Sequence, residues 1–418
     1  MITDSKIDQF ITQQKELINL EQQAEIEQQK LLLEGSSLET LERAGVCVSK
    51  MIIENVKTGL YGKTLYTMVA TNYDKEALKT NESLRTRLSE KFANHRFSPG
   101  DIVGFYEHRE DRMPDFKAKP TLDGVVYKVK EFKIVVSVRD PPEDSSILKK
   151  VYSLALMANE ITYKRYMKVF DKLKQVKAST DYHSEYLVST LIEGQDPNLE
   201  NPHIKRPDLK NLTVKDLQFH DQTLNEDQKA AIAKAFNANA FYLIHGPPGT
   251  GKTKTVCEFI YQCTKKKLRV LACAASNIAV DNMVERLRAK SVSCCRLGHP
   301  ARMLPTVVES CLDKLVSQDD SRKDLKTNKK EINLLLRQLT KTTDRGAIKD
   351  IRKSIYNLEK EIHSLERGAV YSTLSNAEVI LCTNTGAGEK MLEEFVDKLP
   401  GKAFDVVVID ECAQALEI

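Results

Sequence analysis

The sequence lacks the features that mark a secreted or membrane-spanning chain. Its first ten residues, MITDSKIDQF, contain no basic segment followed by an apolar run, and no stretch approaches 18 consecutive apolar residues. A signal peptide and a membrane span are therefore not expected. We expect a cytoplasmic or nuclear protein with no membrane partner.

Cysteine pairs of the kind that bind metals or exchange disulfides are also missing. The nine cysteines are scattered, odd in number, and form no Cys-x-x-Cys pair. Cys273, Cys382 and Cys412 lie in or beside apolar, strand-like runs, where a thiol behaves as a small hydrophobic group. This distribution indicates a reducing compartment and gives no sign of a disulfide framework.

The chain has little excess charge of either sign. It carries 63 Lys and Arg against 59 Asp and Glu, a net charge of +4. Any nucleic-acid surface must therefore come from the local arrangement of residues and not from bulk charge. The length of 418 residues exceeds one ordinary core and predicts two or three domains.

The first 142 residues change from one periodicity to another. Apolar residues between positions 5 and 34 recur at spacings of three, four and seven, which predicts a long stalk helix within residues 1–40, ending at Gly35. Residues 41–142 instead contain five short runs rich in β-branched and aromatic residues, separated by glycine turns. Such runs predict a small antiparallel β-barrel, which serves either as a spacer or as a nucleic-acid surface.

Residues 143–210 are expected to form a second stalk helix and a linker. Helical spacing of Ile147, Val151 and Leu154 indicates that the helix starts near Asp144, and prolines mark the linker after position 196. Residues 211–418 alternate apolar strands with helices, which is typical of a parallel sheet covered on both faces. A helical hairpin at about 310–367, with a heptad-like apolar pattern, interrupts this alternation. Its many basic residues are expected to form a solvated face, with nucleic-acid contact as the alternative.

The segment GPPGTGKT matches the pattern G-x-x-x-x-G-K-[ST] and lies between the apolar run FYLI and a predicted helix. Such a loop binds a nucleotide by aiming successive backbone N–H groups, and the helix N-terminus, at phosphate oxygens. The lysine reaches the β- and γ-phosphates, and the last threonine holds Mg²⁺. The residues expected to bind ATP are Gly246, Pro247, Pro248, Gly249, Thr250, Gly251, Lys252 and Thr253.

Two further positions complete the predicted site. Asp410 and Glu411 follow the apolar run VVVI, so that Asp410 can bind Mg²⁺ through its water shell and Glu411 can polarise the water that attacks the γ-phosphate. Gln228 precedes the P-loop on a helix, and its amide matches the N6 and N7 edge of adenine. The alternative interpretations are an ordinary helix N-terminus for the acidic pair and an ordinary surface position for the glutamine.

The ordered motifs LNEDQ, GPPGTGKT, AASNIAVDN, CTNTGAG and DECAQALE together resemble the Upf1-like branch of superfamily 1 helicases. The resemblance implies an α/β fold: a RecA-like P-loop NTPase sheet with an inserted hairpin, and an antiparallel barrel on a helical stalk. It also implies a monomer that couples ATP hydrolysis to 5′-to-3′ movement on single-stranded DNA or RNA. Ala275 departs from the family, which usually has proline there. The family's nucleic-acid contacts correspond to Ser276, Asn277, Thr383, Asn384 and Thr385.

Members of this family continue past the Asp-Glu pair into another strand and a second RecA-like domain that supplies arginine fingers. These 418 residues contain neither, so we expect the N-terminal part of a helicase, cut inside its first RecA-like domain. We also expect FYLI and VVVID to lack their intervening strand, Asp410 and Glu411 to be misplaced relative to Thr253, and the chain alone to be inactive as an ATPase. The alternatives are a catalytically inactive isoform that binds nucleic acid or protein, and a different P-loop ATPase.

Overall fold

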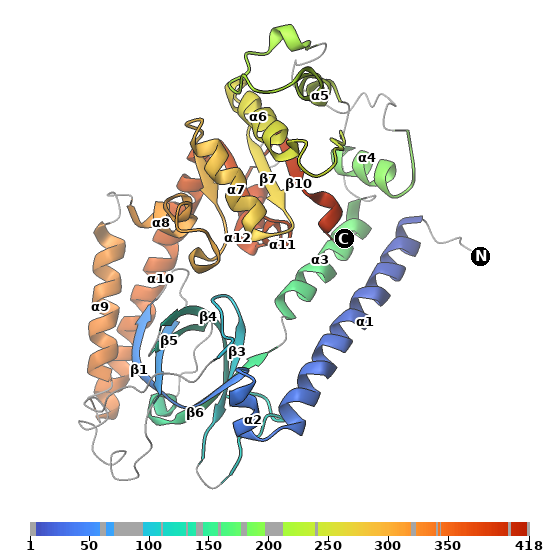
Figure 1. Cartoon of the computed structure of the whole chain (residues 1–418). Helices are drawn as coiled ribbons and strands as arrows, with labels where there is room; N and C mark the ends of the chain where they lie inside the picture. Colours follow the sequence, from blue (N-terminus) through green and yellow to red (C-terminus); the bar gives the residue numbers. More distant parts are fainter. Residues whose placement is uncertain are drawn as a thin grey trace.

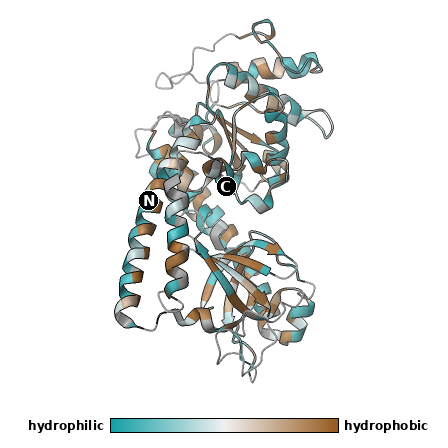
Figure 2. Ribbon diagram, turned by 90° about the vertical axis from the view of Figure 1, so that its left-hand side faces the viewer, coloured by the Kyte–Doolittle hydropathy of each residue, from teal (hydrophilic) through white to brown (hydrophobic). Residues whose placement is uncertain are grey.

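The computed structural model combines a helical stalk, a barrel and a parallel sheet flanked by helices (Figure 1). In Figure 2 hydrophobic residues gather on the strands of the barrel and of the parallel sheet. The structure describes residues 6–58, 64–70, 95–109, 112–130, 133–138, 145–157, 160–176, 182–196, 212–238, 241–318, 323–339, 342, 344–399 and 403–415. The linker prolines expected after position 196 lie outside these ranges.

The stalk consists of two long helices that pack side by side. They are α1 (Lys6–Gly35) and α3 (Glu160–Val176). Ile11 and Ile18 of α1 are buried against Phe170 of α3. The predicted first helix, with its end at Gly35, is confirmed. Several of its apolar residues form one buried side against α3, whereas Leu17 and Leu31 are exposed. The short helices α2 (Leu38–Arg43) and α4 (Tyr182–Leu191) follow α1 and α3 along the chain.

The barrel is closed and antiparallel, with strand order β1-β2-β5-β4-β3-β6. Phe105 and Tyr152, both fully buried, meet edge to face in its core with ring centroids 5.6 Å apart. The predicted barrel is thus confirmed, with one strand more than the five expected. Its strands are β1 (Cys47–Thr58), β2 (Thr64–Ala70), β3 (Ile102–Glu107), β4 (Leu122–Lys130), β5 (Lys133–Val138) and β6 (Val151–Met157).

The helix expected to begin near Asp144 was wrong over its first part. Val151–Met157 is strand β6, which pairs with β1 and β3 and closes the barrel, and the helix begins only at Glu160. Leu154 faces the barrel core, whereas the neighbouring Ala155 packs with residues of α1 and α2 outside it. Because both faces of β6 are buried, the polar alternation that identifies a strand is missing. The barrel therefore continues past residue 142.

The sheet of the second half is parallel, with strand order β10-β7-β9-β8. Helices cover both of its faces, as predicted: α6 and α7 contribute to one hydrophobic cluster with the strands, and α12 and the long helix α10 (Arg345–Asn376) to another. The helix α5 (Glu226–Asn237) precedes the P-loop. The strands and covering helices are α6 (Lys252–Lys265), β7 (Val270–Ala274), α7 (Asn277–Arg288), β8 (Cys294–Arg296), α8 (Leu312–Gln318), β9 (Val379–Thr383), α11 (Asn384–Ala387), α12 (Lys390–Asp397) and β10 (Val406–Asp410).

The expected strand before the P-loop does not form. Residues 241–244 have no strand partner in the described part of the chain, and Leu243 is 72% exposed. Strand β10 lies at the edge of the described sheet, where Val407 and Ile409 are 60% and 50% exposed. The expectation that a strand is missing between these two segments stays a prediction. An apolar edge of this kind is open to further strand pairing.

The inserted hairpin is present as two antiparallel helices, α9 (Lys323–Leu339) and α10 (Arg345–Asn376). Ile332 of α9 packs against Ile355 and Ile362 of α10, and α9 also contacts β1 of the barrel (Figure 1). The predicted coiled-coil hairpin is confirmed, but its bounds differ from 310–367. The predicted start near 310 is too early, because residues 312–318 form α8, which packs in the core beneath the sheet. The predicted end at 367 is also too early, because the last turns of α10 continue to Asn376 and are buried in the same core.

Candidate nucleotide and nucleic-acid site

The P-loop connects residues 241–244 to α6 and requires glycine at two positions. Gly249 and Gly251 have φ values of +81° and +83°, in the left-handed region that other residues enter only with strain. Gly251 is also the N-cap of α6, so the helix begins at Lys252. The backbone N–H groups of the first turn and the positive end of the helix dipole therefore point out of the sheet at the loop, as phosphate binding requires.

The ammonium group of Lys252 lies on the loop that precedes it. Its Nζ donates to the carbonyl oxygen of Gly246 at 2.8 Å. The loop is braced further by Thr250, whose Oγ1 donates to the carbonyl oxygen of Pro247 at 2.7 Å. A phosphate that entered the loop would replace this neutral acceptor with a charged one, and charge-assisted hydrogen bonds are roughly twice as strong as neutral ones.

Thr253 and Asp410 meet directly. The Oγ1 atom of Thr253 donates to Oδ2 of Asp410 at 3.0 Å, and the aspartate is only 4% exposed. Magnesium prefers oxygen ligands, keeps several waters, and commonly takes one or two protein groups together with substrate phosphates. A hydroxyl and a carboxylate at this separation fit that ion, and the described residues contain no cluster of three or more His, Cys, Asp or Glu that could hold a metal without phosphate.

The expectation that Asp410 would be misplaced relative to Thr253 was wrong. It assumed that pairing of residues 241–244 with the sheet sets the position of the P-loop. Instead, Val256 and Ile260 hold α6 on the sheet face, in one cluster with Val408 of β10. The helix that carries Thr253 is therefore positioned by its own buried side, independently of the strand before the loop.

Glu411 follows Asp410 with an unusual backbone. Its φ of +51° and ψ of +42° place it in the left-handed region, which costs energy for a residue with a side chain. Its backbone N–H donates to Oδ1 of Asp410 at 3.1 Å. Strained residues persist where the surrounding structure holds them, often at functional sites. The role of Glu411 in activating water remains a prediction.

Gln228 lies beside the P-loop, but both ends of its amide already have protein partners. Its Oε1 accepts from the backbone N–H of Asn225 at 3.0 Å within a capping box, and its Nε2 donates to the carbonyl oxygen of Thr250 at 2.9 Å. These bonds fix the start of α5 against the loop. Adenine would have to displace one or both of them, so the adenine-binding role remains a prediction.

The candidate nucleic-acid residues follow neighbouring strands that end in register. Asp410 pairs with Ala274, and Ala274 pairs with Thr383, so the carboxyl ends of β10, β7 and β9 lie at one edge of the sheet. Ser276 accepts from the N–H of Ala279, and Thr383 from the N–H of Gly386, as helix N-caps. Each hydroxyl keeps its own hydrogen as a donor for a phosphate oxygen.

Asn277 is held by a buried ion pair that sequence analysis missed. Nη2 of Arg296 donates to Oδ1 of Asn277 at 2.9 Å, and Nε of Arg296 donates to Oδ1 of Asp281 at 2.9 Å. Both charged side chains are 1% exposed, and the second oxygen of Asp281 accepts from the N–H of Leu304. The arginine therefore occupies the oxygen of Asn277 and leaves its NH₂ group as the available donor. The single arginine in the otherwise apolar run CCRL is a signal that a charge is buried there, but the local pattern does not indicate its partner.

The turn at Asn384 and Thr385 contains a buried side-chain oxygen and a contact with the stalk. Oδ1 of Asn384 is buried and has no hydrogen-bond partner among the described residues. The carbonyl oxygen of Thr385 accepts from Nη1 of Arg165, a residue of the stalk helix α3, at 2.8 Å. The structure thus brings Thr383 to Thr385 together with the stalk.

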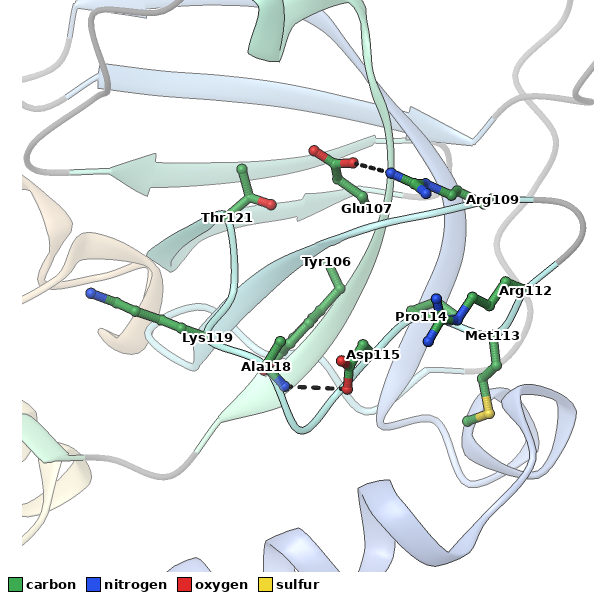
Figure 3. Close-up of a pocket in the computed structure, with 10 residues that line it drawn as sticks. All are labelled: Tyr106, Glu107, Arg109, Arg112, Met113, Pro114, Asp115, Ala118, Lys119 and Thr121. Carbon is green, nitrogen blue, oxygen red and sulfur yellow. Dashed lines mark hydrogen bonds and ion pairs between the residues drawn. The ribbon is translucent and has the colours of Figure 1, made fainter.

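A separate pocket of about 300 Å³ lies on the barrel, along the end of β3 and the chain that follows it (Figure 3). Arg109, Arg112 and Lys119 line it together with Glu107 and Asp115. Two of these charges pair with each other on one side of the pocket, since Nη2 of Arg109 lies 3.6 Å from Oε2 of Glu107 (Figure 3). The pocket contains none of the candidate nucleotide or nucleic-acid residues, and its mixed charge selects no ligand class.

Among the described residues, no helix has both the length and the apolar character needed to cross a membrane.

Comparisons with known proteins give two family matches and several similar relatives. Residues 223–418 match the family described as "AAA domain", and residues 11–157 match that described as "Helicase SMUBP-2/HCS1, 1B domain". The chain is 35% identical over 416 residues to the DNA-binding protein SMUBP-2 of Rattus norvegicus, covering 98% of this chain and 38% of the relative. It is 30% identical to the DNA polymerase alpha-associated DNA helicase A of Schizosaccharomyces pombe, covering 98% of this chain and 58% of that protein.

A third relative matches the second half alone. The regulator of nonsense transcripts 1 homolog of Neurospora crassa is 35% identical over 195 residues, which are 46% of this chain and 16% of that protein. The chain thus spans less than two thirds of the length of each of these relatives. The two family matches follow one another along the chain, and the P-loop, the Asp410 contact and the barrel all lie within them. The two matches and these relatives together support a Upf1-like superfamily 1 helicase.

Proposed function

We propose that this chain is the nucleotide-binding and strand-binding portion of an ATP-dependent helicase that moves 5′ to 3′ along single-stranded DNA or RNA. The observation that carries the proposal is the contact between Thr253 and Asp410, 3.0 Å apart at the mouth of the P-loop. It joins the two parts of a Mg²⁺-nucleotide site that lie far apart in the sequence. The relatives named as helicases support the same class of activity.

In this proposal each residue of the nucleotide site has a separate task. The backbone of residues 246–251 surrounds the phosphates, and Lys252 neutralises charge on the β- and γ-phosphates. Thr253 and Asp410 would hold Mg²⁺, which would supply positive charge next to the phosphates. Glu411 orients and polarises the attacking water. Gln228 contacts adenine, after giving up one of its present hydrogen bonds.

Strand binding would take place at the edge where β7 and β9 end. Ser276, Asn277 and Thr383 present hydroxyl and amide donors there, and such groups contact phosphates without reading sequence. The site lies next to Asp410 through the register of the strands, so the state of the nucleotide can influence it. We expect binding with little sequence preference and with an affinity that falls as salt rises.

The nucleotide site is tested by a titration with a fluorescent ATP analogue and Mg²⁺. Lys252→Ala removes a charge-assisted contact of about 1.5 to 3 kcal/mol, which corresponds to a loss of roughly tenfold or more in affinity. Lys265→Ala, at the other end of the same helix, is the matched control and should bind as the unmodified chain does. Equal affinity of the Lys252→Ala and unmodified chains would refute the nucleotide site.

Turnover is a separate proposal. We infer that these 418 residues alone hydrolyse ATP no faster than their Lys252→Ala variant, because in this family the arginine that neutralises transition-state charge comes from a second RecA-like domain. That arginine contributes on the order of 10³ to 10⁵ in rate. The position of Asp410 does not itself prevent hydrolysis, since the aspartate reaches Thr253. Hydrolysis stimulated by single-stranded nucleic acid in this chain alone would contradict the inference.

A further inference from the structure

We propose that Arg165 of the stalk helix α3 is a positioning residue, which holds the turn of Thr383 to Thr385 in the conformation that binds nucleic acid. Through this contact the barrel is coupled to nucleic-acid binding by the turn. The inference rests on the proposed strand-binding function and adds to it a residue far from the sheet in sequence. Arg165 is separated from Thr385 by 220 positions. It does not need to touch the nucleic acid.

The guanidinium of Arg165 is used as a fork. Its Nη1 donates to the carbonyl oxygen of Thr385 at 2.8 Å, and its Nη2 lies 3.3 Å from Oε1 of Glu389. The side chain of Arg165 is 26% exposed and that of Glu389 is 37% exposed, so both are partly shielded from water. A planar arginine with two partners in fixed directions orders them more strongly than a single flexible ammonium could.

The segment that this fork holds cannot be rigid by itself. Helix α11 has only four residues, Asn384–Ala387, and so short a helix is not stable without outside support. Its N-terminal end is supported by Thr383, whose Oγ1 accepts from the N–H of Gly386 at 3.1 Å. Arg165 supplies the second support by donating to Thr385 within the same turn. Both supports act on the backbone of this short helix, and that of Arg165 acts on Thr385, one of the residues proposed to contact phosphates.

The same face of α3 carries two lysines that pair with α12 and do not contact the Thr383–Thr385 turn. Arg165, Lys168 and Lys172 are spaced three and four residues apart and therefore lie on one side of the helix. They face two glutamates four residues apart: Lys172 lies 2.7 Å and Lys168 3.9 Å from carboxylate oxygens of Glu393, beyond the bond of Arg165 to Glu389. The hydrogen bond from Lys172 lowers the pKa of Glu393, in keeping with a carboxylate that is ionised in this contact.

The other side of α3 and its N-terminal end connect it to the rest of the molecule. Tyr163 and Phe170 are buried against α1, which makes the stalk a packed pair of helices. The last barrel strand, β6, ends at Met157, only three positions before α3 begins at Glu160. A displacement of the barrel therefore reaches Arg165 through one short connection and less than two turns of helix. The barrel and the Thr383–Thr385 turn are thus mechanically linked.

The consequence is a selective effect on strand binding. Neutralising Arg165 releases the backbone of the turn, so that the donors of Thr383 and Thr385 must be ordered again when nucleic acid binds, at a cost in affinity. The P-loop is not part of this contact, so nucleotide affinity is unaffected. Because Arg165 acts through the backbone, the number of phosphates neutralised by the protein is also unchanged.

The test uses the 418-residue chain and a fluorescent 15-nucleotide oligothymidylate, with binding followed by anisotropy at several salt concentrations. Arg165→Met removes both donors and keeps the length of the side chain, whereas Lys168→Met removes a charge from the same helix face without touching the turn. We expect Arg165→Met to weaken binding about tenfold, Arg165→Lys to weaken it less, and Lys168→Met to change it less than twofold. The fluorescent ATP analogue should bind all four chains equally.

Two further measurements separate positioning from other roles. The slope of log affinity against log salt should be the same for Arg165→Met and the unmodified chain; a slope smaller by about 0.7 would mean that Arg165 contacts a phosphate directly and would overturn the proposal. Amide hydrogen exchange at Gly386 should be faster in Arg165→Met, and unchanged exchange would also overturn it.

The proposed strand-binding function and the role of Arg165 fail in different ways. If the unmodified chain does not bind the oligonucleotide, the strand-binding function fails and the role of Arg165 fails with it. If the unmodified chain binds and Arg165→Met binds equally well, only the role of Arg165 is wrong.

Discussion

Replacing Arg296 by methionine should destabilise the parallel-sheet domain severely. Arg296 and Asp281 are each 1% exposed, and the arginine donates to Asp281 and Asn277 at 2.9 Å in both cases. Methionine fills a similar volume but leaves the carboxylate of Asp281 with the N–H of Leu304 as its one remaining donor among the described residues. Breaking a buried pair in this way costs about 3 to 5 kcal/mol, because an uncompensated charge stays buried.

This cost corresponds to a large shift of the unfolding transition. A change of 1 kcal/mol lowers the midpoint temperature by about 2 to 4 °C in a unit of 150 to 250 residues, so Arg296→Met should lower it by roughly 6 to 20 °C. Since the chain contains several cores, a probe confined to this sheet is needed. Cys273, Cys295 and Cys382 are buried in it, and the temperature at which they become reactive to a maleimide reports its unfolding.

The matched control is Arg288→Met. Arg288 is exposed at the end of α7 and donates to the carbonyl oxygen of Thr306 at 2.8 Å, so its loss should cost at most about 1 kcal/mol. If Arg296→Met lowered the temperature of thiol exposure no further than Arg288→Met, the buried ion pair would not stabilise the sheet as described. A second result is expected from the same variant: oligonucleotide binding should weaken even at low temperature, where the sheet is still folded, because Asn277 loses the partner that orients its amide.

Three further predictions concern the P-loop domain. Gly251→Ala should reduce the affinity for the ATP analogue more than Gly249→Ala does. Both positions have a positive φ, but only a Cβ at 251 would lie 2.9 Å from a neighbouring side chain, at Nε2 of Gln228. Equal losses of affinity would contradict this. Burial would raise the pKa of Glu258, but hydrogen bonds from Lys290 and other donors outweigh it and lower the pKa. The carboxylate therefore stabilises the domain at neutral pH, and this contribution is lost as the pH falls below about 4.3 and through the lowered pKa. In urea unfolding, the Glu258→Gln chain should therefore lose less stability on acidification than the unmodified chain. The same pH dependence in both chains would contradict the lowered pKa of Glu258. Cys412 is exposed and the eight other cysteines are buried, so maleimide should label one thiol in the native chain, more slowly with Mg²⁺-ATP bound; a second thiol reacting at the same rate would count against the packing described.

The parts of the fold that were predictable are those in which a single face is buried. Helix α1, the coiled-coil hairpin and the barrel strands β4 and β5 show their period directly, because one side of each element meets solvent. Strand β6 was missed since it is buried on both sides. Residues 241–244 were predicted as a strand from their apolar character, but that character gives no information about whether a pairing partner is present.

The site shows the same division. The P-loop and the acidic pair were predictable because their chemistry fixes residue types at short spacings, and strand register then brought Asp410 to the correct edge. The ion pair of Arg296 and Asp281 and the bond from Arg165 to Thr385 were not predictable in this way. They join elements that are distant along the chain, and nothing in the local pattern of either partner indicates the other.

Helix α10 has a mechanical consequence of its own. It is one continuous helix of 32 residues, about 48 Å long at 1.5 Å per residue. Its first turns form the hairpin that lies beside the barrel, whereas Val370 and Leu374 near its end are buried under the sheet, just before β9 leads to Thr383. A helix of this kind acts as a lever with its fulcrum in the sheet: a tilt of about 5° there would move the hairpin tip by roughly 4 Å, given that length. Conversely, a force of any origin on the tip would be delivered, reduced in amplitude, to the strand that carries the proposed nucleic-acid contacts.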